Sequence, residues 1–228
     1  MEIPENLGRV EERIAEAAAR VGRKPSDVLL VAVTKNVDAE RVSEAIRAGV
    51  RAIGENRVQE AEAKWPLLPS GPERHLVGRL QRNKAGKAVL LFDRIESIDD
   101  APLAEAVSRR AEAIGKRIPV LVEVNVSGEE TKAGVGPEGV RGLLERIAPL
   151  AGIAPDGLMT IGPLTEDAER IRSAFRRMRL LFEELGARPP GGLPMRHLSM
   201  GMSGDFEIAV EEGATIVRVG SAIFGPRG

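Results

Sequence analysis

The chain of 228 residues contains no cysteine, and its only histidines are His75 and His197. The absence of cysteine excludes disulfides, thiolate metal sites and cysteine nucleophiles. Two histidines supply few ligands for a metal centre, so we expect no metal. Both histidines fall on short expected strands, where we interpret them as hydrogen-bonded structural residues rather than catalytic ones.

Excess charge and long apolar segments are also absent. The 33 basic and 34 acidic residues are mixed along the chain and give a formal net charge of -1, which disfavours a general role in binding nucleic acid or membrane surfaces. No apolar run reaches the roughly 20 residues that a membrane-spanning helix requires. Residues 1–6 lack the apolar core of a signal peptide. We therefore expect a cytoplasmic protein that binds neither nucleic acid nor membrane.

Short apolar runs alternate with longer amphipathic segments, a pattern typical of strand and helix units that build a parallel sheet. Residues 166–185 illustrate the helices, because Ile171, Phe175 and Met178 recur there at spacings of three or four. The pattern predicts eight strands. They are residues 28–34, 51–54, 74–78, 94–98, 118–125, 157–161, 195–199 and 215–219.

One more helix is predicted before the first strand, where Leu7, Val10 and Ile14 share a face. Only residues 221–228 follow the last strand. We therefore predict a single (β/α)8 TIM-type barrel over residues 1–228, in which the N-terminal helix takes the place of a missing last one. The alternative is an open doubly wound sheet, but no Gly-x-Gly-x-x-Gly motif follows the first strand to support a dinucleotide site.

Lys35 closes the first apolar run, where a buried strand should meet solvent. The chain has seven lysines against 26 arginines, so a lysine here is less expected as surface decoration. A lysine amine can lose its proton when desolvated and can then condense with an aldehyde, which arginine cannot do. The alternative is a solubilising strand end.

Two predicted loops suit an anion. The segment from Ser199 to Gly204 and the pair Gly220 and Ser221 offer backbone amides, glycine and hydroxyl groups, which bind phosphate without a cationic side chain. Both follow strands seven and eight, where barrels often bind phosphate. A Schiff-base lysine and a phosphate cradle on one rim indicate an aldehyde that carries a phosphate, and pyridoxal 5'-phosphate fits. Helix capping is the alternative role for Ser199 and Ser203.

Six motifs then occur in order along nearly the whole chain: VTK at 33–35, GENRVQE at 54–60, HLVGRLQRNK at 75–84, GLMTIG at 157–162, LSMGMSGDF at 198–206 and RVGSAIFG at 218–225. Together they closely resemble the motifs of the pyridoxal phosphate homeostasis proteins, single-domain relatives of the N-terminal barrel of alanine racemase. The chain departs from that family pattern at Arg57, where an aromatic residue is common, and at Arg79, where histidine is common.

The resemblance implies a role for each motif. Lys35 would form the internal aldimine with pyridoxal phosphate, Asn56 would lie near the ring and Arg218 would face the pyridine nitrogen. The phosphate would be held by Ser199, Gly220 and Ser221, with Met200 and Gly201 nearby. Because arginine stays protonated, the facing nitrogen is disfavoured from accepting a proton, which weakens the cofactor as an electron sink and disfavours transamination. The alternative for Arg218 is an inward barrel residue paired with Glu123 or Glu55.

The chain also has no tyrosine. By resemblance, alanine racemase uses a lysine base and a tyrosine base, the latter from a separate β domain of its partner subunit, so the two-base route is closed here. We therefore predict a non-enzymatic, monomeric protein that binds pyridoxal phosphate and delivers it, with the apo-forms of pyridoxal phosphate enzymes as possible partners. The alternatives are a weak racemase that exchanges protons slowly at Lys35, or a Schiff-base barrel enzyme that acts on a phosphorylated metabolite.

Overall fold

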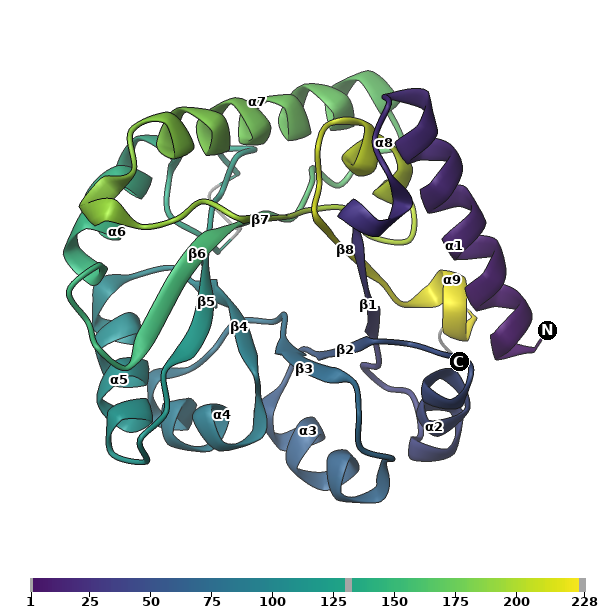
Figure 1. The fold of residues 1–228 in the computed structure, drawn as a ribbon, viewed down its shortest axis with the longest axis horizontal. Helices are drawn as coiled ribbons and strands as arrows, with labels where there is room; N and C mark the ends of the chain where they lie inside the picture. Colours follow the sequence, from purple (N-terminus) through teal and green to yellow (C-terminus); the bar gives the residue numbers. More distant parts are fainter. Residues whose placement is uncertain (1, 130–132, 226–228) are drawn as a thin grey trace.

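Eight parallel strands close into a barrel in the computed structural model, which describes residues 2–129 and 133–225. Each strand pairs with the next one in the chain, and β8 pairs with β1 (Figure 1). This confirms the (β/α)8 prediction and excludes the open sheet. The strands are β1 Leu29–Val33, β2 Ala52–Glu55, β3 Glu73–Leu76, β4 Arg94–Ile98, β5 Ile118–Glu123, β6 Ile153–Met159, β7 His197–Ser199 and β8 Ile216–Val219.

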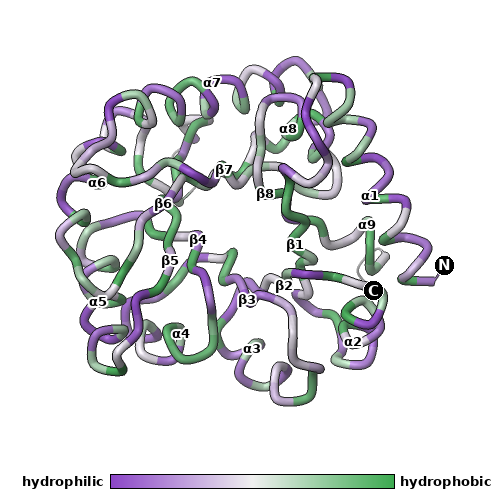
Figure 2. Tube along the Cα trace, in the orientation of Figure 1, coloured by the Kyte–Doolittle hydropathy of each residue, from purple (hydrophilic) through white to green (hydrophobic). Residues whose placement is uncertain are grey.

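Helices surround the barrel and alternate between hydrophobic and hydrophilic residues along their length (Figure 2). They are α1 Ile3–Arg20, α2 Ala39–Arg47, α3 Val58–Lys64, α4 Ala85–Leu91, α5 Ala101–Glu112, α6 Val140–Ile147, α7 Ala168–Ala187, α8 Phe206–Glu211 and α9 Ser221–Phe224. Short 3-10 turns occur at Pro25–Asp27, Trp65–Leu67, Arg82–Lys84, Pro137–Gly139 and Pro190–Gly192. Within the described ranges, no helix combines the length and the apolar character that a membrane span requires.

The N-terminal helix α1 completes the ring of helices. Its apolar face, which includes Leu7, Val10 and Ile14, is buried, and the helix packs against α2, α8 and α9 (Figure 1). Burial of each such side chain contributes about 1.5–3 kcal/mol. The helix after β8 has only four residues, so α1 covers the place where a full-length last helix would lie, as predicted.

The prediction was least accurate for β6, which begins at Ile153 rather than at residue 157. The additional residues include Pro155 and Asp156, two residue types that are depleted in strands. Pro155 pairs with Val120 of β5, and the register then shifts so that Leu121 pairs with Gly157, which leaves Asp156 as the extra residue of a bulge. Asp156 accepts a hydrogen bond from Arg94 at 2.7 Å, so its carboxylate is satisfied inside the barrel.

The barrel interior is part apolar and part polar. One side holds a small apolar cluster of Val31, Ala52, Val77, Leu121, Met159 and Ile216. The polar side includes four side chains that are almost fully buried, His75, Glu96, Ser199 and Arg218. Most other apolar side chains pack between the strands and the helices. The polar groups therefore cross the centre of the barrel toward its carboxyl end, where the candidate site lies.

Candidate functional site

A cavity of about 370 Å³ opens at the carboxyl ends of the strands. Its volume lies within the range of about 300–1,000 Å³ that is typical of small-molecule sites. Five of the eight predicted site residues line it: Lys35, Asn56, Arg218, Gly220 and Ser221. The loops after β1, β2 and β8 therefore converge as the barrel prediction required.

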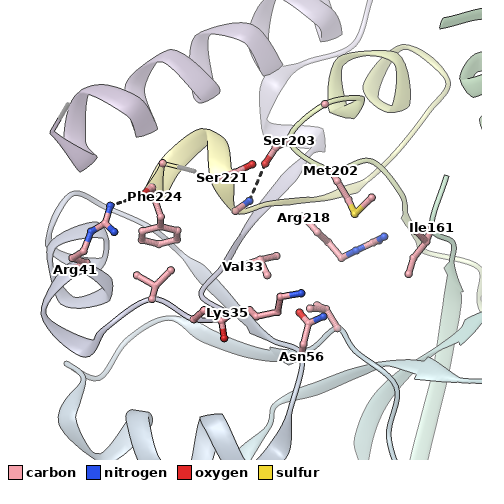
Figure 3. A pocket seen from close by; sticks show the side chains of 16 residues that line it. Val33, Lys35, Arg41, Asn56, Ile161, Met202, Ser203, Arg218, Ser221 and Phe224 are labelled. Atoms are coloured by element: carbon pink, nitrogen blue, oxygen red, sulfur yellow. Dashed lines mark hydrogen bonds between the residues drawn. The ribbon is translucent and has the colours of Figure 1, made fainter. Parts of the chain in front are cut away.

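Lys35 lies directly after β1 in a tight turn, in which the Val37 amide donates to the Thr34 carbonyl at 3.0 Å. The next residue, Asn36, has φ +58°, the only positive φ of a non-glycine residue in the described ranges. Asparagine tolerates this left-handed conformation better than most residues. The turn directs the half-buried Lys35 side chain into the cavity, near Asn56 (Figure 3). A purely solubilising strand end does not fit this position.

Arg218 extends from β8 into the same cavity and is only 4% exposed. Its guanidinium donates to Ser199 Oγ at 2.6 Å and to the Thr160 carbonyl at 2.8 Å. The alternative partners, Glu55 and Glu123, form no ion pair with Arg218 in the described residues. Glu55 is bound to Lys64 at 2.6 Å, and the carboxylate that forms an ion pair with Arg218 is Glu96, at 3.9 Å.

A chain of short hydrogen bonds continues behind Arg218. Ser199 Oγ lies 2.5 Å from Glu96 Oε2, and Glu96 Oε1 lies 2.6 Å from His75 Nδ1. The other ring nitrogen of His75 forms an ion-pair contact of 3.2 Å with Glu73. Four side chains from β3, β4, β7 and β8 thus link the cavity to the opposite end of the barrel.

The charges along this chain are well defined. Burial opposes the charged form of His75, but contacts with Glu73 and Glu96 outweigh it and raise the pKa of His75 to about 9. Burial likewise opposes the ionised form of Glu96, and its contacts with His75 and Arg218 outweigh this and lower its pKa. The contact with His75 is also the main reason that the pKa of Glu73 is lowered to about 2. At neutral pH, cations and carboxylates therefore alternate through the barrel.

The predicted anion loops meet at Ser203. Its Oγ accepts a hydrogen bond from the Gly220 amide at 3.2 Å (Figure 3) and another from the Ala222 amide at 3.3 Å. Gly220 lies close to β1, since a Cβ atom there would be 3.2 Å from the Val33 carbonyl oxygen. Two backbone donors therefore already point at one oxygen beside the cavity, which is the arrangement that an anion requires.

Three predicted residues lie elsewhere. Ser199 is fully buried beneath Arg218, and Met200 is fully buried in the core between barrel and helices. Gly201 has φ +95°, and a Cβ atom on it would lie 2.5 Å from the Ala209 Cβ. None of the three lines the cavity. The Gly201 turn instead brings Ser203 to the cavity, so the hydroxyl that this loop presents there lies four residues later than predicted: it belongs to Ser203 rather than to Ser199.

The alternative capping role also fails for both serines. Helix α8 begins at Phe206, and no side chain caps its first amides. Ser203 lies within the predicted anion loop, although it is not among the residues predicted to hold the phosphate. Arg41 was missed altogether: it lines the cavity from α2 and donates to the Phe224 carbonyl. Arg41 lies on an ordinary amphipathic helix, so the sequence pattern does not indicate that it lines the cavity.

Comparison with known proteins identifies the family. Residues 6–228 match the family model for the alanine racemase N-terminal domain. A pyridoxal phosphate homeostasis protein of Aquifex aeolicus is 45% identical over 228 residues, which cover 98% of this chain and 97% of the relative. The chain belongs to the pyridoxal phosphate homeostasis protein family. The family resemblance inferred from the six motifs is therefore confirmed.

Solved structures agree with this family assignment. PipY of Synechococcus elongatus PCC7942, solved with pyridoxal phosphate bound, is 40% identical with a TM-score of 0.82, over 93% of this chain and 100% of that one. An alanine racemase of Clostridium difficile has a TM-score of 0.74 at 14% identity, over 95% of this chain and 59% of that one. The second likeness concerns the fold alone and confirms the alanine racemase-like barrel.

Proposed function

We propose that this chain binds pyridoxal 5'-phosphate in the Lys35 cavity, with the Lys35 amine as its covalent attachment point, and that it serves in holding and delivering the cofactor. One observation carries the proposal: a single cavity is lined both by Lys35 and by the Gly220 and Ser221 turn. An amine that can condense with an aldehyde and a cradle for a phosphate thus share one space. The pyridoxal phosphate bound to the related PipY supports the same cofactor.

The phosphate end fits the backbone donors. The amides of Gly220 and Ala222 converge on the Ser203 hydroxyl, and a phosphate oxygen accepts the same type of hydrogen bond. A side chain on Gly220 would crowd the Val33 carbonyl at 3.2 Å, so glycine permits the close approach of this turn to β1. We infer that Gly220, Ser221 and Ser203 hold the phosphate and that Ser199 contributes only through Arg218.

The ring end fits Asn56 and Arg218, which both line the cavity. When bound, pyridoxal phosphate supplies an aldehyde and an electron-withdrawing pyridine ring. Arg218 can present only donors and stays charged, because Ser199 and Thr160 hold its guanidinium and Glu96 offsets its charge. We infer that it orients the ring through the pyridine nitrogen and disfavours protonation of that atom.

The proposed role is retention rather than turnover. The chain has no tyrosine to act as a second base opposite Lys35, so the two-base racemisation route is closed. We further propose that the protein is a monomer, and we propose the apo-forms of pyridoxal phosphate enzymes as recipients.

Borohydride reduction of the loaded protein tests the attachment point. A pyridoxyl adduct is expected on the peptide that contains Lys35, and Lys35→Ala should lose it, whereas the matched control Lys84→Ala should keep it. An adduct on another lysine in the unaltered protein would overturn the assignment. Delivery is tested separately by mixing the loaded protein with an apoenzyme: no faster activation than by free cofactor released into solution would refute that part and leave binding intact.

A further inference from the structure

A second cavity, of about 250 Å³, adjoins the Lys35 cavity. The two share Asn56, Val77 and Ile161 in their walls. The remainder of the second cavity is lined by residues that follow β3 and end β5, including Arg79 and Glu123. None of these additional residues has a role in the proposed phosphate or ring contacts.

Glu123 is the unusual group in this second cavity. It is the last residue of β5 and is only 4% exposed. Its backbone is fixed because its carbonyl accepts the Val135 amide at 2.9 Å. Its side chain lines the second cavity, and within residues 2–129 and 133–225 no hydrogen bond or ion pair joins its carboxylate to another side chain. A largely buried carboxylate without a protein donor is unfavourable. A cationic ligand in the cavity would supply the missing partner.

The charges around Glu123 are of both signs. Burial and the nearby Asp99, which follows β4, raise the pKa of Glu123 to about 7, while Arg218 on β8 and Arg79 after β3 act in the opposite direction. Arg79 is largely exposed, and its nearest described carboxylate, Asp99, lies 3.8 Å away. Glu123 is therefore the carboxylate that lines the cavity, and Asp99 does not line it. Of the two guanidiniums near Glu123, Arg218 already donates to Ser199 and Thr160, and Arg79 lies in the cavity wall.

A metal ion is a poorer occupant than an ammonium group. Hard cations such as Ca²⁺ take six to eight oxygen ligands, and no group of three or more histidine, aspartate or glutamate side chains in the described residues could hold a metal. A single unpartnered carboxylate with apolar neighbours, Val77 and Ile161, instead suits a small organic cation.

We propose that this second cavity binds the ammonium group of a small primary amine, with Glu123 as its counter-ion. The binding goes beyond the proposed function. The biochemical purpose of amine binding rests on the proposed function, because an amine in the second cavity would lie beside the cavity where the cofactor binds, and pyridoxal phosphate reacts with primary amines. Arg79, at the rim, is placed to receive a carboxylate if the amine belongs to an amino acid.

Titration of the cofactor-free protein with n-propylamine, followed by amide NMR shifts, tests the binding without any activity assay. The expected shifts include the Glu123, Val124 and Asn125 amides, and affinity should rise about fivefold or more from pH 6 to pH 8. Over this range the Glu123 carboxyl loses its proton, while an alkylamine, with a pKa of about 10, keeps its own. Propanol, the neutral analogue, should bind at least tenfold more weakly.

Variants complete the test. Glu123→Gln keeps the size of the side chain and should lower propylamine affinity at least tenfold and abolish its pH dependence, whereas Glu62→Gln, a surface control, should change neither. A comparison with L-alanine identifies the source of the ammonium group. If L-alanine binds more tightly than propylamine and Arg79→Gln removes the difference, the natural ligand is an amino acid. If L-alanine binds more weakly than propylamine, the natural ligand is a simple amine. Equal affinity in Glu123→Gln, or equal binding of propanol, would overturn the inference. Loss of the Lys35 adduct would not bear on it.

Discussion

Replacement of Glu96 by glutamine probes the buried chain of charges that supports Arg218. The carboxylate lies between His75 Nδ1 at 2.6 Å and Ser199 Oγ at 2.5 Å, and all three side chains are fully buried. Glutamine preserves the shape but removes the charge, which leaves Arg218 and His75 without their shared counter-ion. Breaking a buried pair in this way costs about 3–5 kcal/mol.

The pH dependence of folding stability gives a second estimate of how much the buried charges contribute. The pKa of His75 rises from 6.5 to about 9 on folding, which corresponds to about 3 kcal/mol of stability. Because the folded pKa is the higher one, this stability is fully present below about pH 6.5 and is lost as the pH rises toward 9. Glu96→Gln removes one of the two carboxylates responsible, so the loss of stability should be largest near pH 6 and should shrink toward pH 9.

Urea unfolding at pH 6 and pH 9 measures both effects, with fluorescence of the single tryptophan as the signal. Trp65 is 2% exposed and packs against Phe92 at 4.5 Å, so unfolding should change its emission. We expect Glu96→Gln to lose about 3 kcal/mol at pH 6 and clearly less at pH 9. The control Glu62→Gln, which removes an exposed pair with Lys87, should lose less than about 1 kcal/mol. A Glu96→Gln loss below 1 kcal/mol at pH 6, with the pH slope of the unaltered protein, would refute this account.

Two further substitutions test the anion loops. Gly201→Ala should destabilise the protein by about 1–3 kcal/mol, because alanine is strained at φ +95° and its Cβ would meet that of Ala209 at 2.5 Å. Urea unfolding measures this loss of stability, and Gly142→Ala is the control, because a Cβ at position 142 meets nothing within 4 Å. Equal losses of stability in the two variants would contradict the argument. Ser203→Ala should lower stability by about 1 kcal/mol, or about 2–4 °C in Tm, because it removes the acceptor of the Gly220 and Ala222 amides. Calorimetry measures the Tm, with Ser70→Ala as the control because Ser70 is exposed. An unchanged Tm in Ser203→Ala would count against the prediction.

The barrel could be predicted because its evidence is local. Apolar runs alternate with segments of helical period, and each strand lies beside the next in the chain. The start of β6 could not, because Pro155 and Asp156 resemble loop residues until their partners are known. In the structure, the register between β5 and β6 shifts at Asp156, and the Asp156 carboxylate accepts from the guanidinium of Arg94 on β4. Neither feature is encoded near residue 155.

The residues of the candidate site could likewise be predicted only in part. Lys35, Asn56 and Arg218 end or follow strands, so the barrel topology alone brings them to one rim. The choice between Ser199 and Ser203 depends on the path of the chain after β7. Ser199 is still in the strand and faces the interior, and only the turn at Gly201 returns the chain to the cavity. The predicted strand also ends at residue 199, but the sequence pattern does not show that the turn at Gly201, with φ +95°, returns Ser203 to the cavity.

The partner of Arg218 could not be derived from sequence, yet it decides what the site can do. Burial lowers the pKa of Arg218, while Glu96, Glu123 and Asp205 raise it. Of these, Glu96 acts through Ser199 and is itself held ionised by His75. A carboxylate in direct contact would occupy the donors that Arg218 presents to the cavity. The intervening hydroxyl avoids this, because it leaves the neutralising charge 3.9 Å away and keeps the guanidinium both charged and oriented. The interior chain of charges therefore favours a fixed cation at the floor of the cavity, which suits a site that retains its ligand.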